Sequence, residues 1–126
     1  MSKASLLTHH ITQKGDPMIF LSLEDFYEKA DSCSRLSREE EIECAKQMAT
    51  GNADARERLI QSYLPMTAAH VRHAIPRMQT LGLALYCYQA LEKAVDSFHF
   101  LQDSETFAHR LSWYLRQATT GYIVRE

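Results

Sequence analysis

The chain has 126 residues, of which 45% are hydrophobic and 24% are charged, and its formal net charge is -2 at pH 7. This length and apolar content suffice for one folded domain, while four glycines and three prolines are too few for a fibrous or disordered chain. No apolar run approaches the roughly 18 residues that a membrane-spanning helix needs, so we expect a soluble, globular protein. Three cysteines without CxxC spacing predict free thiols rather than disulfides or a zinc site.

The N-terminal segment, residues 1–15, has neither the long apolar stretch nor the small-residue cleavage site of a signal peptide. We therefore expect a flexible tail and a cytoplasmic protein. Asp16 and Pro17 form a helix-start signal, because an aspartate caps well and proline suits the first helical position. The folded domain is accordingly expected to cover residues 16–126.

Two capping signals define the first expected helices. Ser22 and a carboxylate three residues later have capping-box spacing, which predicts a helix that ends near Asp31. Ser37 and Glu40 form a second capping box, followed by acidic residues where the helix dipole favours negative charge. We expect this second helix to end at Gly51.

The next helix is expected to begin at Asn52 and to end at Pro76. Pro65 interrupts its apolar periodicity. Because proline removes a hydrogen bond of the helical ladder and clashes with the preceding turn, a kink or break is predicted near Tyr63.

The remaining chain also carries helical signals. A largely buried helix is expected over residues 80–98, and Ser104 is the predicted cap of a last helix that runs towards the C-terminus. No segment alternates between apolar and polar residues as a half-buried strand does. The predicted fold class is therefore all-α, a compact bundle of about five helices.

The last helix has two different faces when its residues are wound at about 100° each. The stripe expected to face the core consists of Phe107, Leu111, Tyr114, Ala118 and Tyr122, and the opposite, polar side carries His109, Trp113, Arg116, Gln117 and Thr120. Trp113 is the only tryptophan of the chain. It either packs in a small second core or stacks on an unpaired base of a nucleic acid. The low net charge and a neutral charge balance over residues 103–126 count against the nucleic acid.

Three segments, taken in order, resemble the sigma-70 family, whose members direct bacterial RNA polymerase to promoters. The segments are LSREEEIECAKQMATGNADARERLIQSYL at 36–64, LEKAVDSF at 91–98 and FAHRLSWYLRQATT at 107–120. The resemblance covers roughly residues 16–124 and concerns the second conserved region of the family with the helix before it. Its most specific element is the aromatic pair followed by Leu-Arg-Gln-Ala. It implies an all-helical domain whose last helix holds the melted minus-ten promoter element.

The resemblance also implies roles for single residues. Trp113 and Tyr114 match the aromatic pair at the upstream fork of the melted DNA. Gln117 and Thr120 match residues that face the first base pair of the element, and Arg116 matches a basic residue beside them.

Two further positions complete the predicted DNA-binding set. His109 lies on the polar face of the last helix, and Arg110 stands where the family has an aromatic residue that supports the flipped base. Both residues are expected to contact promoter DNA, although the arginine at position 110 departs from the aromatic residue of the family.

The segment 82–90, GLALYCYQA, is apolar where the family docks on RNA polymerase through acidic and amide residues. Contact with the polymerase core is therefore expected to be weak or to depend on a partner. Leu83, Tyr86, Tyr88 and Gln89 are the predicted partner-contact residues if the segment is exposed. The alternative is that the same segment is buried.

Two functions follow from these patterns. The first is a short sigma-like transcription protein that contacts promoter DNA and RNA polymerase core. A candidate partner in this case is a second protein that supplies the C-terminal sigma regions. The second is a protein-interaction module or regulator that kept the fold without DNA binding. His70 and His73 have a spacing that two metal ligands can share, but no other ligand converges with them, so no metal, cofactor or enzyme activity is predicted.

Overall fold

The computed structural model describes residues 18–100 and 106–125, and its regular structure is helical throughout these ranges. In chain order the elements are α2 (Leu23–Asp31), α3 (Arg38–Ala49), α4 (Ala53–Ser62), α5 (Leu64–Arg72), the 3-10 turn η1 (Pro76–Met78), α6 (Leu81–Ser97) and α7 (Phe107–Arg125). The described ranges contain no strand. The all-α fold class is confirmed, and α4 and α5 are the two halves of the predicted third helix.

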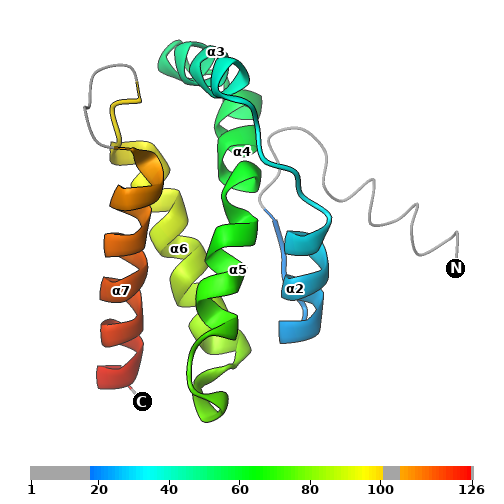
Figure 1. Cartoon of the computed structure of the whole chain (residues 1–126), viewed down its shortest axis with the longest axis vertical. Helices are drawn as coiled ribbons and strands as arrows, with labels where there is room; N and C mark the ends of the chain where they lie inside the picture. Colours follow the sequence, from blue (N-terminus) through cyan, green and yellow to red (C-terminus); the bar gives the residue numbers. More distant parts are fainter. Residues whose placement is uncertain (1–17, 101–105, 126) are drawn as a thin grey trace, which may run out of the picture.

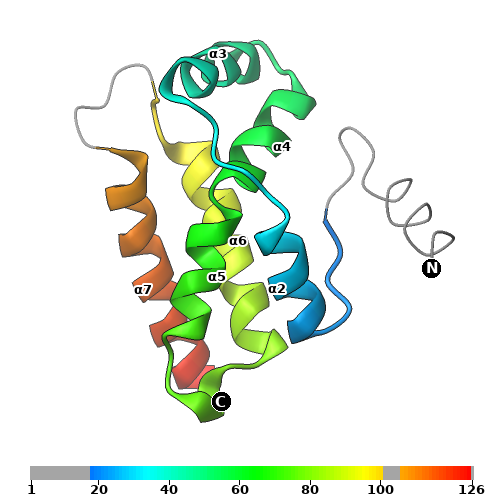
Figure 2. The same ribbon diagram turned by 45° about the vertical axis from the view of Figure 1, so that its right-hand side comes forward.

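The helices pack as an irregular bundle with α7 at one edge (Figures 1 and 2). α6 and α7 run antiparallel and form the largest helix interface, while α2 packs on α5 and α6 from the other side. α3 crosses the end of α4 and lies away from the C-terminal half of α7 (Figure 2). Because α7 has its extensive contact with α6 alone, its outer face is left open.

The predicted caps of α3 and α4 are present. The Ser37 hydroxyl accepts from the Glu40 backbone N–H at 3.1 Å, and the Glu40 carboxylate accepts from the Ser37 backbone N–H at 2.9 Å. Gly51 follows α3 with φ at +92°, a left-handed conformation that glycine adopts without strain. Asn52 then caps α4 by accepting from the Ala55 N–H at 3.1 Å. The predicted boundary between these helices is therefore confirmed.

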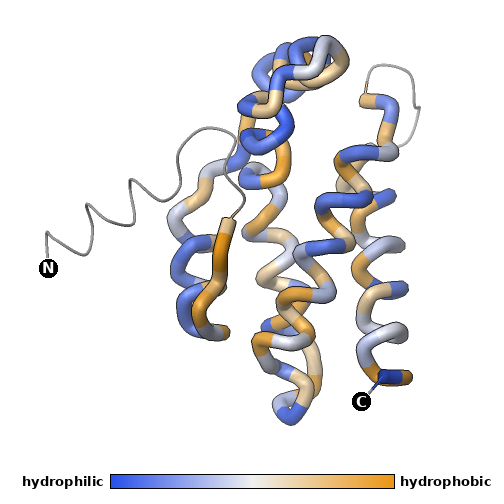
Figure 3. Tube along the Cα trace, turned by 180° about the vertical axis from the view of Figure 1, so that it is seen from behind, coloured by the Kyte–Doolittle hydropathy of each residue, from blue (hydrophilic) through white to orange (hydrophobic). Residues whose placement is uncertain are grey.

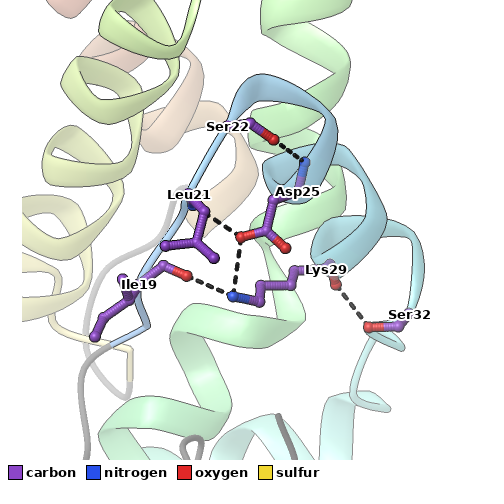
Figure 4. Close-up of polar contacts among 6 residues, drawn as sticks. All are labelled: Ile19, Leu21, Ser22, Asp25, Lys29 and Ser32. Atoms are coloured by element: carbon purple, nitrogen blue, oxygen red, sulfur yellow. Dashed lines mark hydrogen bonds and ion pairs between the residues drawn. The ribbon is translucent and has the colours of Figure 1, made fainter. Parts of the chain in front are cut away.

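An extended apolar segment, residues 18–21, precedes α2 and is hydrogen-bonded to it (Figures 3 and 4). Ser22 caps α2 by accepting from the Asp25 N–H at 3.0 Å. The Asp25 carboxylate reaches past the cap to the Leu21 N–H at 2.9 Å and also accepts from Lys29 at 3.1 Å. Lys29 in turn donates to the Ile19 carbonyl. The Asp25 carboxylate therefore accepts from the residue before the cap, whereas in a regular capping box it accepts from the cap residue itself. The helix-start signal at residues 16 and 17 and the expected tail, residues 1–15, lie outside the described residues.

The predicted break falls at Tyr63, between α4 and α5. Pro65 occupies the first turn of α5, where its missing N–H has no ladder partner to lose. The Tyr63 carbonyl instead accepts from both the backbone and the hydroxyl of Thr67, at 3.1 and 3.0 Å. Burial, followed by the hydrogen bond that Tyr63 donates to Glu41, raises the pKa of its phenol to about 12.

The core lies between α4, α5, α6 and α7, with α2 closing one side. Its largest fully buried side chains include Phe26, Leu59, Ile60, Leu64, Leu83, Leu91, Leu111 and Leu115.

The three cysteines are free thiols, as predicted. None of the described helices has the length and apolarity required to cross a membrane. Within the described ranges, no three His, Cys, Asp or Glu side chains are grouped closely enough to hold a metal ion.

Candidate nucleic-acid interface

The helix that carries all seven predicted DNA-binding residues begins at Phe107. Thr106 occupies the capping position, because its hydroxyl accepts from the His109 N–H at 3.2 Å and its carbonyl accepts from the Arg110 N–H at 3.3 Å. Ser104, the predicted cap, lies outside the described residues. The described helix thus starts later than expected, and a threonine caps it.

The buried side of α7 differs in part from the predicted stripe. Its buried side chains are Phe107, Leu111, Leu115 and Tyr122. Tyr114 and Ala118 are only half-buried, so the assignment of Tyr114 to the core is wrong and Leu115 takes that place. The reason is that α7 packs against α6 on one side and touches α5 on the other, which centres its buried arc between them.

The aromatic pair lies at the boundary between core and solvent. Trp113 is 50% exposed, which confirms the predicted outward position. Tyr114 bends towards α6, where its hydroxyl lies 2.8 Å from that of Ser97. The two rings meet edge to face with centroids 5.3 Å apart. Tyr114 therefore anchors one edge of the Trp113 indole and leaves the rest of it accessible.

A groove of about 620 Å³ lies on the surface between α6 and α7, beside the aromatic pair. Trp113, Tyr114 and Gln117 line it from α7, and Tyr86 and Gln89 line it from α6. The structure thus brings part of the predicted DNA-binding set and part of the predicted partner-contact set onto one surface. The groove is also lined by two cationic side chains, Lys93 and Arg125.

A second hollow, of about 360 Å³, lies on the other side of the aromatic pair. It is lined by His109, Arg110, Trp113, Tyr114 and Arg116. Thr120 borders neither hollow but is exposed on the same outer face, and its hydroxyl donates to the Arg116 carbonyl at 3.1 Å. All seven predicted DNA-binding residues therefore belong to one helix, and most line the two hollows that meet at Trp113.

Two predicted partner-contact residues are buried. Leu83 is fully enclosed, and Tyr88 packs edge to face on Phe20 with ring centroids 5.0 Å apart. The assignment of both residues to a contact surface is wrong, because their helical positions turn them towards the core together with the neighbouring alanine and cysteine. Tyr86 is half-buried and Gln89 is exposed, so these two remain accessible.

Charge is distributed unevenly over the bundle. Residues 64–91 contain no aspartate or glutamate, and neither does α7. The acidic residues of the described chain lie on α2, α3 and α4, and at Glu92 and Asp96 of α6. Residues 103–126 contain equal numbers of acidic and basic residues, but the acidic ones lie outside the bounds of α7. Within its bounds α7 therefore carries arginines and no carboxylate, although the whole chain is slightly acidic.

Sequence reasoning missed the contact between α7 and α5. The His70 Nε2 lies 2.8 Å from the Thr119 hydroxyl. Burial lowers the pKa of the His70 imidazole, and the neighbouring His73 and Arg116 lower it further. The spacing of His70 and His73 predicts that they share a helix face, but the contact of this face with α7 depends on the tertiary fold.

Comparison with known proteins adds no assignment. No family model matches the chain, and no solved structure matches it. The resemblance to the second conserved region of sigma-70 factors therefore stays a prediction based on the segments given above.

Proposed function

We propose that this chain is a sigma-like transcription protein that binds unpaired promoter DNA on the outer face of α7. The observation that carries the proposal is the half-exposed Trp113, which stands between two hollows on a helix without carboxylates. An exposed indole can stack on any unpaired base, and a locally basic helix attracts the phosphates of the same strand.

The neighbouring side chains supply complementary contacts. Gln117 lies in the α6 groove with Trp113, and an amide side chain can pair with two atoms of an adenine edge. Arg116 lies on the other side of the indole, where it can neutralise a phosphate. The remaining contacts would come from His109, Arg110 and the hydroxyl of Thr120.

The proposed partner contact uses the accessible part of α6. Tyr86 and Gln89 line the groove and present an aromatic ring and an amide, rather than the acidic docking surface of the family. Binding to RNA polymerase core would accordingly be weak or would need a second protein. Such a protein could supply the C-terminal sigma regions.

One observation favours the alternative function, a protein-interaction module. Leu85, Ile123 and Val124 are exposed apolar side chains near the same end of the antiparallel α6–α7 pair. Clusters of exposed apolar residues are typical of contact surfaces between proteins. This reading predicts partner binding without any affinity for DNA.

The intrinsic fluorescence of Trp113 tests the proposal directly, since the chain has no other tryptophan. We expect single-stranded and forked minus-ten oligonucleotides to quench this fluorescence. In a labelled-DNA titration, Trp113→Ala is expected to weaken affinity roughly 5- to 150-fold, which corresponds to about 1–3 kcal/mol for a stacked base. Trp113→Phe keeps a ring and should lose less.

Two further variants separate stacking from charge. Gln117→Ala should relax the preference at one base pair, whereas Arg116→Ala should weaken all sequences and lower the salt dependence by about one ion. Gln47→Ala, at a half-buried glutamine of the acidic helix α3, is the control for the loss of a glutamine side chain away from α7 and should leave binding unchanged. Failure of the unmodified protein to bind any of the oligonucleotides at low salt would refute the proposal.

A further inference from the structure

α7 has a second edge, opposite the α6 groove, where it meets α5. The contact is the hydrogen bond between His70 of α5 and Thr119 of α7, at 2.8 Å. Arg116 precedes Thr119 by three residues and therefore lies on the same side of α7, one turn away. The positive charge of Arg116 is one of the groups that lower the pKa of the His70 imidazole, after burial and His73.

The hydrogen bonds of the Thr119 hydroxyl favour one tautomer of the neutral His70 ring. The single hydroxyl proton of Thr119 is donated to the Leu115 carbonyl at 3.0 Å, so the hydroxyl accepts from the His70 Nε2–H. In the neutral ring the other nitrogen, Nδ1, then carries no proton. Protonation of His70 would add one N–H donor and one positive charge without breaking the bond to Thr119.

His73 is arranged in the complementary way. Its Nδ1 lies 3.0 Å from the Ala69 carbonyl and donates to it, because a carbonyl can only accept. The neutral ring therefore has an unprotonated Nε2, and protonation again adds a donor without the loss of an existing bond. The two rings lie three residues apart on the last turn of α5 and the residue after it, which places them on one face.

Among the residues that the structure describes, the causes of the lowered pKa of His70 include no carboxylate. On α5 itself Arg72 pairs with Asp31 of α2 at 3.0 Å. On α6 the neighbour of Thr119 is the Cys87 thiol, and burial raises its pKa to about 12, so that it stays uncharged. α7 contributes Arg116.

We propose that His70 and His73 form, together with Arg116, a proton-dependent binding site for the phosphodiester backbone of the strand that lies on α7. The inference rests on the proposed function, because it assumes a nucleic acid strand as the ligand. Thr119 stands six residues after Trp113, about 9 Å along the helix and about 120° around it, and Arg116 lies midway between them. A strand stacked on the indole would therefore pass Arg116 before its phosphates reach the α5 edge.

The sign of the pH dependence follows from the charges. A phosphate favours the imidazolium form, so the bound strand raises the pKa of both rings, and binding takes up protons. Affinity is therefore highest below the pKa values of the complex and is lost as the pH rises through them. Because burial lowers the pKa of the His70 imidazole in the free protein, the rise in affinity extends to lower pH, and we expect it to be on the order of tenfold from about pH 8 to about pH 5.

The test uses two probes on the full chain. The imidazole resonances of His70 and His73 are followed by NMR during pH titration, with and without an abasic oligodeoxynucleotide, which offers phosphates but no bases. Both pKa values are expected to rise when this strand is added. Separately, affinity for an ordinary single-stranded oligonucleotide is measured across the same pH range.

Variants connect the two measurements. His73→Gln is exposed and bonds only to its own helix, so it should fold normally and should reduce the pH dependence of affinity. His70→Gln should reduce it too, and melting curves will show whether the loss of the Thr119 contact destabilises the fold. His99→Gln, an exposed histidine beyond the end of α6, is the control and should leave the pH dependence unchanged.

The outcomes distinguish this inference from the proposed function. If the histidine pKa values do not move while the ordinary oligonucleotide quenches Trp113, the function stands and the phosphate site is refuted. If both pKa values rise with the abasic strand while Trp113 is not quenched by bases, the phosphate site stands and the stacking is refuted. If neither probe responds, both proposals are wrong.

Discussion

Replacement of Gly82 by alanine tests how closely α6 and α7 are fitted beside the groove. A Cβ at this position would lie 3.0 Å from Cε1 and 3.1 Å from the hydroxyl oxygen of Tyr122. The Tyr122 ring has little freedom to move away, because its hydroxyl lies 2.8 Å from that of Thr80 and its ring meets the Tyr86 ring edge to face, with centroids 5.4 Å apart. We therefore expect Gly82→Ala to displace the ring and to weaken both contacts.

The magnitude follows from opposing contributions. Loss of the hydroxyl pair costs about 1 kcal/mol, and a disturbed aromatic pair costs about 1 kcal/mol more. Alanine in place of glycine within a helix stabilises by roughly 0.5–1 kcal/mol. The net result is a destabilisation of about 1 kcal/mol, which for a chain of this length lowers the melting temperature by roughly 3–5 °C.

Gly121→Ala is the matched control, since this glycine lies in α7 on the same groove. Its added Cβ would meet Tyr86 at 3.9 Å, an ordinary van der Waals contact, so the substitution should raise the melting temperature by roughly 2–4 °C. Thermal unfolding followed by circular dichroism measures both variants. Tyr122→Phe should cost less in the Gly82→Ala protein than in the parent. If both alanine variants stabilise the protein equally, the close approach of Tyr122 to α6 is wrong.

Two other predictions concern stability. Ser37→Ala removes the hydroxyl that accepts from the Glu40 backbone N–H, while the backbone N–H of residue 37 can still donate to the Glu40 carboxylate. The substitution should lower the free energy of unfolding by about 1 kcal/mol, measured by denaturant titration; an unchanged value would show that α3 does not depend on its cap. Burial raises the pKa of the Glu57 carboxyl, and its Oε2 has no hydrogen-bond partner among the described residues. Because a raised folded pKa means that stability falls as the carboxyl ionises, Glu57→Gln should raise the melting temperature at about pH 7 and have less effect at about pH 4. A larger gain at the lower pH would contradict this assignment.

Local signals in the sequence sufficed to predict most helix boundaries. The hydroxyl of Ser37, the amide of Asn52 and the ring of Pro65 act on backbone groups within three or four residues, so their effect does not depend on the rest of the fold. The exposure of Trp113 was predictable for the same reason, because helical periodicity alone opposes it to Phe107 and Leu111.

Contacts between distant segments were not predictable in this way. Tyr114 and Leu115 both lie near the apolar stripe, and the choice between them depends on where α5 meets α7. Likewise, Leu83 and Tyr88 point inwards because α6 is covered on several sides, including by Phe20 from the segment before α2. A helical wheel contains no information about how many neighbours a helix has.

The separation of charges explains how a chain with a net charge of -2 can present a surface for phosphates. Arg116 stands nine residues into α7, about 14 Å from the end of the helix that lies nearer α3 (Figure 1). This exceeds the Debye length of about 10 Å at 0.1 M salt, so the carboxylates of α3 are largely screened at Arg116. Asp96, on α6, is neutralised by a bidentate pair with Arg56 at 2.6 and 2.9 Å. Among the described residues, the carboxylates of α3 and Asp96 therefore contribute little to the potential at Arg116, and the net charge of the chain is a poor guide to the local potential on this face.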